Sequence, residues 1–108
     1  MKLTLSAIIS SEKIKDYLLS QRKRNDKSKW LSIAGYNLDN WQKLEEDLRT
    51  QLLNLDALFI NKTEYGNMYE INDALQGPNG KSLTVCTIWM IEHETKLTKF
   101  ITMYPGKK

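Results

Sequence analysis

The hydrophobic positions of the first half of the chain follow the period of an α-helix. One apolar face predicts a first helix over residues 11–20, and a shorter apolar stretch predicts a second over 30–34, stopped by Gly35. A third helix is expected from about residue 38 to 55, because apolar side chains recur every three or four positions. Its apolar face consists of Leu38, Trp41, Leu44, Leu48, Leu52 and Leu55.

From residue 57 the pattern changes to the alternation of extended strands. Four runs are expected to form strands, and the turn sequence GPNG at 77–80 separates the second from the third. The runs are 57–60, 68–75, 81–92 and 97–104. The third run is apolar at both alternating sets of positions, which predicts a central strand. The fold class is therefore α+β, with two or three N-terminal helices packed on a four-stranded antiparallel sheet and the third helix across one face.

Composition narrows the class of protein further. With 108 residues, 41% hydrophobic and 27% charged, the chain is expected to fold as a single domain, residues 1–108. No apolar run reaches the roughly 18 residues of a membrane span, so no membrane association and a cytoplasmic location are expected. One cysteine and one histidine leave no ligand set for a structural zinc, so neither metal nor cofactor is predicted.

The charge is concentrated near the N-terminus. Residues 1–30 hold eight Lys or Arg against three acidic residues, although the net charge of the whole chain is only +3. A cluster of cations could neutralise phosphates, with Trp30 beside it as a stacking surface for a base; a solvated surface and a core tryptophan are the alternatives. The cluster consists of Arg22, Lys23, Arg24, Lys27 and Lys29.

A few side chains could take part in proton transfer or phosphate binding. His93 has an ordinary pKa near neutrality and is a candidate general acid or base, or else a surface-loop residue between two glutamates. Thr87, Thr102 and Tyr104 lie on the last two expected strands, where their hydroxyls could hold a phosphate or serve only as strand formers. Cys86 is expected to be buried in the central strand and inert.

Several short segments together resemble an uncharacterised bacterial domain family associated with toxin loci and with the C-terminal ends of contact-dependent inhibition proteins. The segments occur in the family's order and span nearly the whole chain. They are KIKDYLLS at 13–20, KSKWL at 27–31, GY at 35–36, EYG at 64–66, GPNG at 77–80, TIW at 87–89 and TMY at 102–104.

The resemblance implies an architecture like that of small ribonuclease toxins of the barnase, colicin and RelE kind. It equates Lys27 with the family's lysine before the second helix, and Thr87, Trp89, Thr102 and Tyr104 with its C-terminal positions. The family has a His-Pro and a Gly in the loop before that lysine. This chain has QRKRND at 21–26 and is two residues shorter there. Either His93 substitutes for the loop histidine or activity has been lost.

The leading hypothesis is a metal-independent ribonuclease-type toxin domain that cleaves RNA. Lys27 would stabilise the developing phosphorane charge, Thr87 or Thr102 would orient the phosphate, and His93 would move a proton. The RNA-binding residues would be Arg22, Lys23, Arg24, Lys29 and Trp89. A cognate antitoxin or immunity protein is the expected protein partner, and the chain is expected to be a monomer or weak dimer, acting in the cytoplasm in which it is made or of a target cell.

The alternative is a non-catalytic binding module that docks nucleic acid or an acidic protein through the basic loop 22–29. The nuclease hypothesis requires Lys27 and Thr102 to meet in one cleft.

Overall fold

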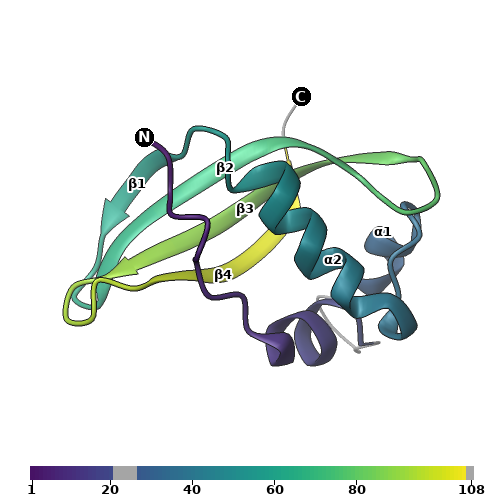
Figure 1. Ribbon diagram of the computed structural model, residues 1–108, viewed down its shortest axis with the longest axis horizontal. Coiled ribbons are helices and arrows are strands. Elements are labelled where there is room, and N and C mark those ends of the chain that lie inside the picture. Colours follow the sequence, from purple (N-terminus) through teal and green to yellow (C-terminus); the bar gives the residue numbers. More distant parts are fainter. Residues whose placement is uncertain (21–26, 107–108) are drawn as a thin grey trace.

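The computed structural model describes residues 1–20 and 27–106 and confirms the α+β fold, with three helical segments packed against a four-stranded antiparallel sheet (Figure 1). The first helical segment, η1 (Lys13–Leu18), has the wider turns of a π-helix. The second, α1 (Ser28–Ser32), is short, and its chain turns away at Gly35, whose φ of +94° lies in the left-handed region that glycine adopts without strain.

The long third helical segment is continuous but changes its winding along its length. It comprises η2 (Leu38–Asn40), α2 (Trp41–Asp47) and η3 (Leu48–Leu52). The Asn37 side chain accepts hydrogen bonds from the backbone N–H groups of Asp39 and Asn40, so Asn37 is the N-cap of this segment. This segment crosses one face of the sheet diagonally (Figure 1), as the apolar face of the sequence predicts.

The sheet is a simple antiparallel meander in the order β1-β2-β3-β4. Its strands are β1 (Leu58–Lys62), β2 (Gly66–Gln76), β3 (Ser82–Glu92) and β4 (Thr98–Pro105). Within this order β3 pairs with β2 over its whole length and with β4 along most of it, so the predicted central strand is confirmed. The first strand is an edge, and all five of its residues are exposed.

Alternation along β3 gives the sheet two different faces. Val85, Thr87 and Trp89 point toward the helices, where they are buried completely with the apolar faces of η1 and α2. Residues in between, including Cys86 and Ile88, point to the opposite face, which we call the open face because none of the helices in Figure 1 crosses it. The open face is therefore where polar side chains of β2, β3 and β4 can reach solvent.

The N-terminal segment ties the two edges of the sheet together. It begins beside β1, where Lys2 bridges to Asp56, and reaches β4, where Ile8 bridges to Lys99. Between these bridges it passes on the helical side of the sheet and buries Leu3 and Ala7 (Figure 1). It thus delivers η1 to the edge of β4, beside the last strand.

Candidate active site

The ammonium group of Lys27 is held between a helix and the last strand. Its Nζ lies 3.1 Å from Thr102 Oγ1 and 3.4 Å from the Tyr17 hydroxyl, donating to both. The same nitrogen lies 5.1 Å from the centre of the Tyr17 ring and 6.0 Å from that of Tyr104. These distances are typical of cation–π contacts, so two aromatic rings and two hydroxyls fix one positive charge. We call these four residues the Lys27 cluster.

Local structure explains how residues so far apart in sequence meet. Lys27 immediately precedes α1, and that helix is docked on the β2–β3 turn by Asn79, whose Nδ2 donates to the Ile33 carbonyl over 2.9 Å. The Gly77 backbone lies so close to Ala34 that a Cβ at residue 77 would clash with the Ala34 carbonyl oxygen. The GPNG turn is thus a docking site for α1 as well as a hairpin turn.

A β-bulge turns the last strand so that Thr102 faces outward. Phe100 pairs with Trp89 and Thr102 pairs with Ile88, which leaves Ile101 as the extra residue between them. The Ile101 carbonyl accepts a hydrogen bond of 2.8 Å from Lys13 Nζ on η1. Bulges commonly re-aim a side chain beside a functional site, and this one places Thr102 on the open face two residues after the buried Phe100.

The polar contacts extend from the Lys27 cluster into the middle of the open face. Tyr104 pairs with Cys86 across the two strands, and Cys86 Sγ donates to Glu70 Oε2 over 3.3 Å. The interaction with Cys86, then burial and the charges of Cys86 and Glu70, raise the pKa of Tyr104 to about 12. Burial, and more weakly Glu70, raises the pKa of the Cys86 thiol against an opposing effect of Tyr104. Both groups stay protonated at neutral pH, so Tyr104 can donate a proton there.

Strand register places Glu70 opposite the Lys27 cluster. Glu70 pairs with Ile88, and Ile88 pairs with Thr102, so the three side chains form one row on the open face. Glu70 and Thr102 are two strands apart, about 10 Å between backbones. The Glu70 side chain extends part of the way across that gap. The apolar Ile88 lies between the Glu70 carboxylate and the Lys27 ammonium that is bonded to Thr102. No local sequence pattern marks Glu70, because only the pairing register of the strands brings it here.

Two of the predicted site residues lie on the other face of the sheet. Thr87 is fully buried, donates to the Ile71 carbonyl and accepts from Trp89 Nε1. Trp89 is also fully buried, and its ring packs edge-on against Phe100 with the ring centres 5.2 Å apart. The structure therefore separates Thr87 and Trp89 from the Lys27 cluster, since alternation turns them toward the core. Thr87 therefore does not face a phosphate bound at the Lys27 cluster, and Trp89 does not face RNA bound there.

His93 is placed at the far end of the sheet. It follows β3 in the turn before β4, where its Nε2 lies 2.9 Å from the Thr63 carbonyl. His93 lies five residues of extended chain beyond Ile88, the partner of Thr102. The backbones of His93 and Ile88 are therefore about 17 Å apart. The structure therefore does not bring His93 to Lys27, as proton transfer by His93 at this site would require.

The rest of the basic cluster is described only in part. Arg22, Lys23 and Arg24 lie outside the described residues. Lys29 is exposed on α1 and lines a separate hollow of about 510 Å³ that also includes Tyr36 and Asp39. Lys27 and Thr102 meet as the nuclease hypothesis requires, whereas Lys29 is a neighbour on the surface. Tyr17 and Lys13 were not expected at the site, although both belong to the KIKDYLLS segment.

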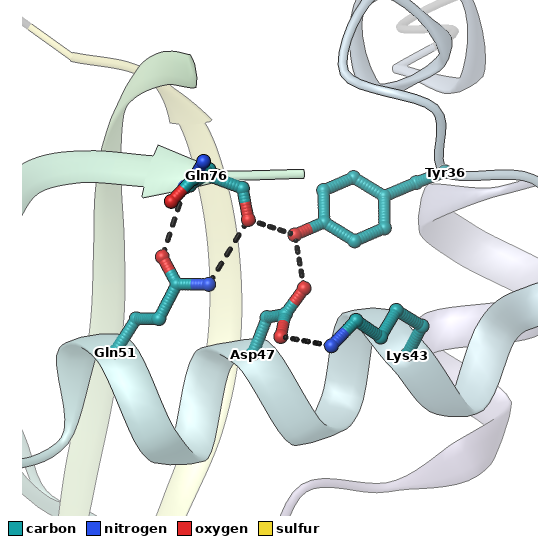
Figure 2. Close-up of polar contacts among 5 residues, drawn as sticks. All are labelled: Tyr36, Lys43, Asp47, Gln51 and Gln76. Atoms are coloured by element: carbon teal, nitrogen blue, oxygen red, sulfur yellow. Dashed lines mark hydrogen bonds and ion pairs between the residues drawn. The ribbon is translucent and has the colours of Figure 1, made fainter. Parts of the chain in front are cut away.

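A second polar group joins the helices to the sheet at the boundary of the core, with Tyr36 and Asp47 buried and Gln76 exposed (Figure 2). The Tyr36 hydroxyl lies 2.7 Å from Asp47 Oδ2 and 3.2 Å from the Gln76 carbonyl, while Lys43 Nζ lies 3.1 Å from Asp47 Oδ1. Gln51 closes the arrangement with two hydrogen bonds to the backbone of Gln76. We call these five residues the Tyr36 bridge. Burial, the hydrogen bond and the negative charge of Asp47 raise the pKa of Tyr36 well above its ordinary value.

The described part of the chain holds neither a metal-binding group of side chains nor a membrane-spanning helix. Over residues 1–20 and 27–106, no group of three or more His, Cys, Asp or Glu side chains could hold a metal ion. Within the same ranges, no helix is long and apolar enough to cross a membrane.

Comparison with known proteins gives one structural neighbour and one family. No curated protein matches the chain. A chain of a contact-dependent growth inhibition toxin–immunity protein complex from Klebsiella pneumoniae 342 is similar in fold, with a TM-score of 0.64 and 18% sequence identity. The match covers 95% of this chain and 96% of that chain. Residues 3–107 match a family described as a domain of unknown function, DUF6883, and the chain belongs to that family.

Proposed function

We propose that this chain is a toxin domain of the metal-independent ribonuclease type, with its active site at the Lys27 cluster and Glu70. The observation that carries the proposal is the 3.1 Å contact between Lys27 Nζ and Thr102 Oγ1, which joins the basic N-terminal segment to the last strand. The similarity in fold to a chain of a toxin–immunity complex supports the toxin context.

Cleavage of RNA without a metal requires three groups around the scissile phosphate. A base removes the proton of the ribose 2′-OH, a cation stabilises the charge of the phosphorane, and an acid protonates the leaving oxygen. Lys27 is the cation, because its amine is partly buried and already fixed between rings. The Thr102 hydroxyl, bonded to that amine, orients a non-bridging oxygen of the phosphate.

Glu70 and Tyr104 supply the proton transfers. Glu70 accepts the proton of the 2′-OH, the 2′ oxygen forms a bond to phosphorus, and the bond from phosphorus to the 5′ oxygen breaks. Tyr104 gives its proton to that departing oxygen, since its raised pKa keeps it protonated at neutral pH. The products are a 2′,3′-cyclic phosphate and a free 5′-OH. Lys29 contacts a phosphate of the RNA backbone outside the reacting centre.

Incubation of the protein with total RNA tests this proposal directly. The wild-type chain should produce fragments ending in 2′,3′-cyclic phosphate, equally with and without EDTA. Lys27→Ala should cleave about 10²- to 10³-fold more slowly, the range found when one group that stabilises transition-state charge is removed. Lys62→Ala is the matched control, because it removes an exposed lysine from β1 at the other edge of the sheet. Absence of cleavage by the wild-type chain would reject the proposal.

An immunity protein is the proposed protein partner. A protein that covers the open face with acidic side chains would neutralise Lys27 and exclude RNA from the same surface. Genes immediately adjacent to this one are the place to look for it. Its co-purified complex should show no cleavage of total RNA, and free chain released from that complex should regain activity.

A non-catalytic binding module is the second candidate, and one observation favours it. The chain's only histidine lies about 17 Å from the row that contains Thr102, so proton transfer depends on a carboxylate and a phenol. A binding module of this kind, including the immunity side of a toxin pair, would bind RNA or an acidic protein without turnover. Its affinity would fall steeply with salt, because bound counterions are released on binding.

A further inference from the structure

A hollow beside the Lys27 cluster has the character of a ligand subsite. It has a volume of about 490 Å³ and is lined by Lys13 and Tyr17 of η1 and by Ile101 and Thr102 of β4. This volume falls within the range of small-molecule sites, about 300–1,000 Å³. Lys27 is not among these lining residues, but its amine donates to two of them, Tyr17 and Thr102. A ligand bound here would therefore lie beside the amine that we assign to the phosphate.

The walls and the polar groups of the hollow have distinct roles. The Tyr17 ring and the Ile101 side chain offer apolar surface, as a planar base requires. Lys13 Nζ donates one of its three hydrogens to the Ile101 carbonyl over 2.8 Å, which holds the amine at the bulge and leaves two hydrogens for a ligand. Thr102 adds a hydroxyl. Of the described residues that line the hollow, Lys13, Tyr17 and Thr102 carry hydrogen-bond donors, and none carries a carboxylate.

This distribution of donors selects among the four bases. Guanine presents two adjacent acceptors, O6 and N7, whereas adenine places the N6 amine, a donor, beside N7. Cytosine presents an amine as well, and uracil presents one acceptor on the corresponding edge. An ammonium group with two available hydrogens matches the O6 and N7 pair of guanine. The amine of adenine would instead face Lys13 with a donor against a donor.

We propose that this hollow is a nucleobase subsite that takes guanine, with Lys13 bonded to O6 and N7 and the adjoining phosphate on Lys27. The inference rests on the proposed function only for its setting, because it names the nucleotide that this active site receives. Base recognition by Lys13 and phosphate binding by Lys27 are separate, so one can fail without the other.

The base preference of the subsite can be measured directly from the binding of nucleoside 3′-monophosphates, without any cleavage of RNA. Amide and methyl resonances of Ile101 and Thr102 should shift on titration with guanosine 3′-monophosphate. Its affinity should exceed that of the adenosine, cytidine and uridine 3′-monophosphates by about tenfold or more, the lower range for a good bidentate base contact.

Variants at the two lysines separate the two contacts. Lys13→Gln should lower the affinity for guanosine 3′-monophosphate to that for adenosine 3′-monophosphate. The Gln amide should still donate a hydrogen bond to the Ile101 carbonyl. Lys13→Arg should retain the preference, which guards against a merely structural effect. Lys27→Gln should weaken all four nucleotides alike. Unchanged melting temperatures are the check on folding.

The outcomes distinguish this inference from the proposed function. Equal affinity for all four nucleotides, no binding of any of them, or a guanine preference that survives in Lys13→Gln would each overturn the subsite. Guanine-selective binding by a chain that never cleaves RNA would support the subsite and reject the nuclease. Cleavage of RNA without any preference at the nucleotide 5′ to the broken bond would reject the subsite and retain the nuclease.

Discussion

The Lys27 cluster and the Tyr36 bridge both connect the helical layer to a strand, but they differ in how completely their polar atoms are used. In the bridge, Asp47 is only 3% exposed, and both of its oxygens have partners. In the cluster, Tyr104 is 41% exposed, and the Lys27 ammonium contacts two hydroxyls and two rings but no carboxylate in the described contacts.

Under the proposed function, this difference assigns the Tyr36 bridge to stability and the Lys27 cluster to binding. The buried Tyr36–Asp47 pair at the centre of the bridge already uses its polar atoms within the chain, so its contribution is to stability. The partly buried ammonium of Lys27 has no carboxylate among its contacts with the described residues, so it retains its attraction for an anion. The comparison predicts that substitutions in the cluster change activity with little effect on folding, whereas substitutions in the bridge do the reverse.

The largest effect is expected from Glu70→Gln on RNA cleavage. Loss of the proton acceptor should slow cleavage about 10²- to 10⁴-fold, the usual contribution of a general base. Gln keeps an oxygen that can accept from Cys86, so the melting temperature should change little. Single-turnover cleavage of a labelled RNA measures the rate. Cleavage at the wild-type rate would show that the 2′-OH proton goes elsewhere.

Asp47→Ala should have the next largest effect, on stability. It removes a charge-assisted bond to Tyr36 and the ion pair with Lys43, which should lower the free energy of unfolding by about 2–3 kcal/mol. Urea denaturation measures this change. Cleavage per folded molecule should stay at the wild-type level. A loss of activity larger than the loss of folded protein would mean that the bridge also shapes the site.

Tyr36→Phe should have a smaller effect that depends on pH. Because the folded state raises the pKa of Tyr36, the folded chain keeps a proton that the unfolded chain loses above about pH 10. Wild-type stability is therefore fully present below pH 10 and falls as the pH rises further. Phe removes that dependence and costs about 1 kcal/mol at pH 7 for the lost hydrogen bond. Denaturation at pH 7 and pH 10.5 compares the two proteins, and an unchanged alkaline decline in the variant would assign it to another group.

The smallest effect is expected from His93→Asn. His93 contacts Thr63 at the far end of the sheet, so cleavage should stay within about twofold of wild type at every pH measured. A fall of about 10²-fold, as for a general acid or base, would return His93 to the site.

The fold was predictable from the sequence because local patterns and the tertiary structure agree. Leu44 and Leu48 belong to the apolar stripe of the third helix, and both side chains are completely buried. The run 81–92 is apolar at both sets of alternating positions, and it forms a strand paired with another strand on each side. The winding changes of the long helix and the bulge at Ile101 were not predicted. Both depend on packing between distant segments, for which no local signal exists.

The site was predictable only in part. Lys27, Thr102 and Tyr104 were identified, and the structure places them together. Thr87 was assigned to the site although it points to the core. Alternation along 81–92 was visible in the sequence, but both sets of positions are apolar, so it did not show which set faces the helices. Glu70 was missed because its proximity arises from the register of β2, β3 and β4.

The most direct measurement is an NMR titration of the labelled chain with a 2′-O-methylated RNA oligonucleotide, which binds but has no 2′-OH to react. Resonances of Lys27, Thr102 and Tyr104 should shift progressively, while those of Tyr36, Asp47 and Gln76 should stay in place. Shifts centred on the turn around His93, or no shifts at all, would contradict an RNA-binding site on the open face.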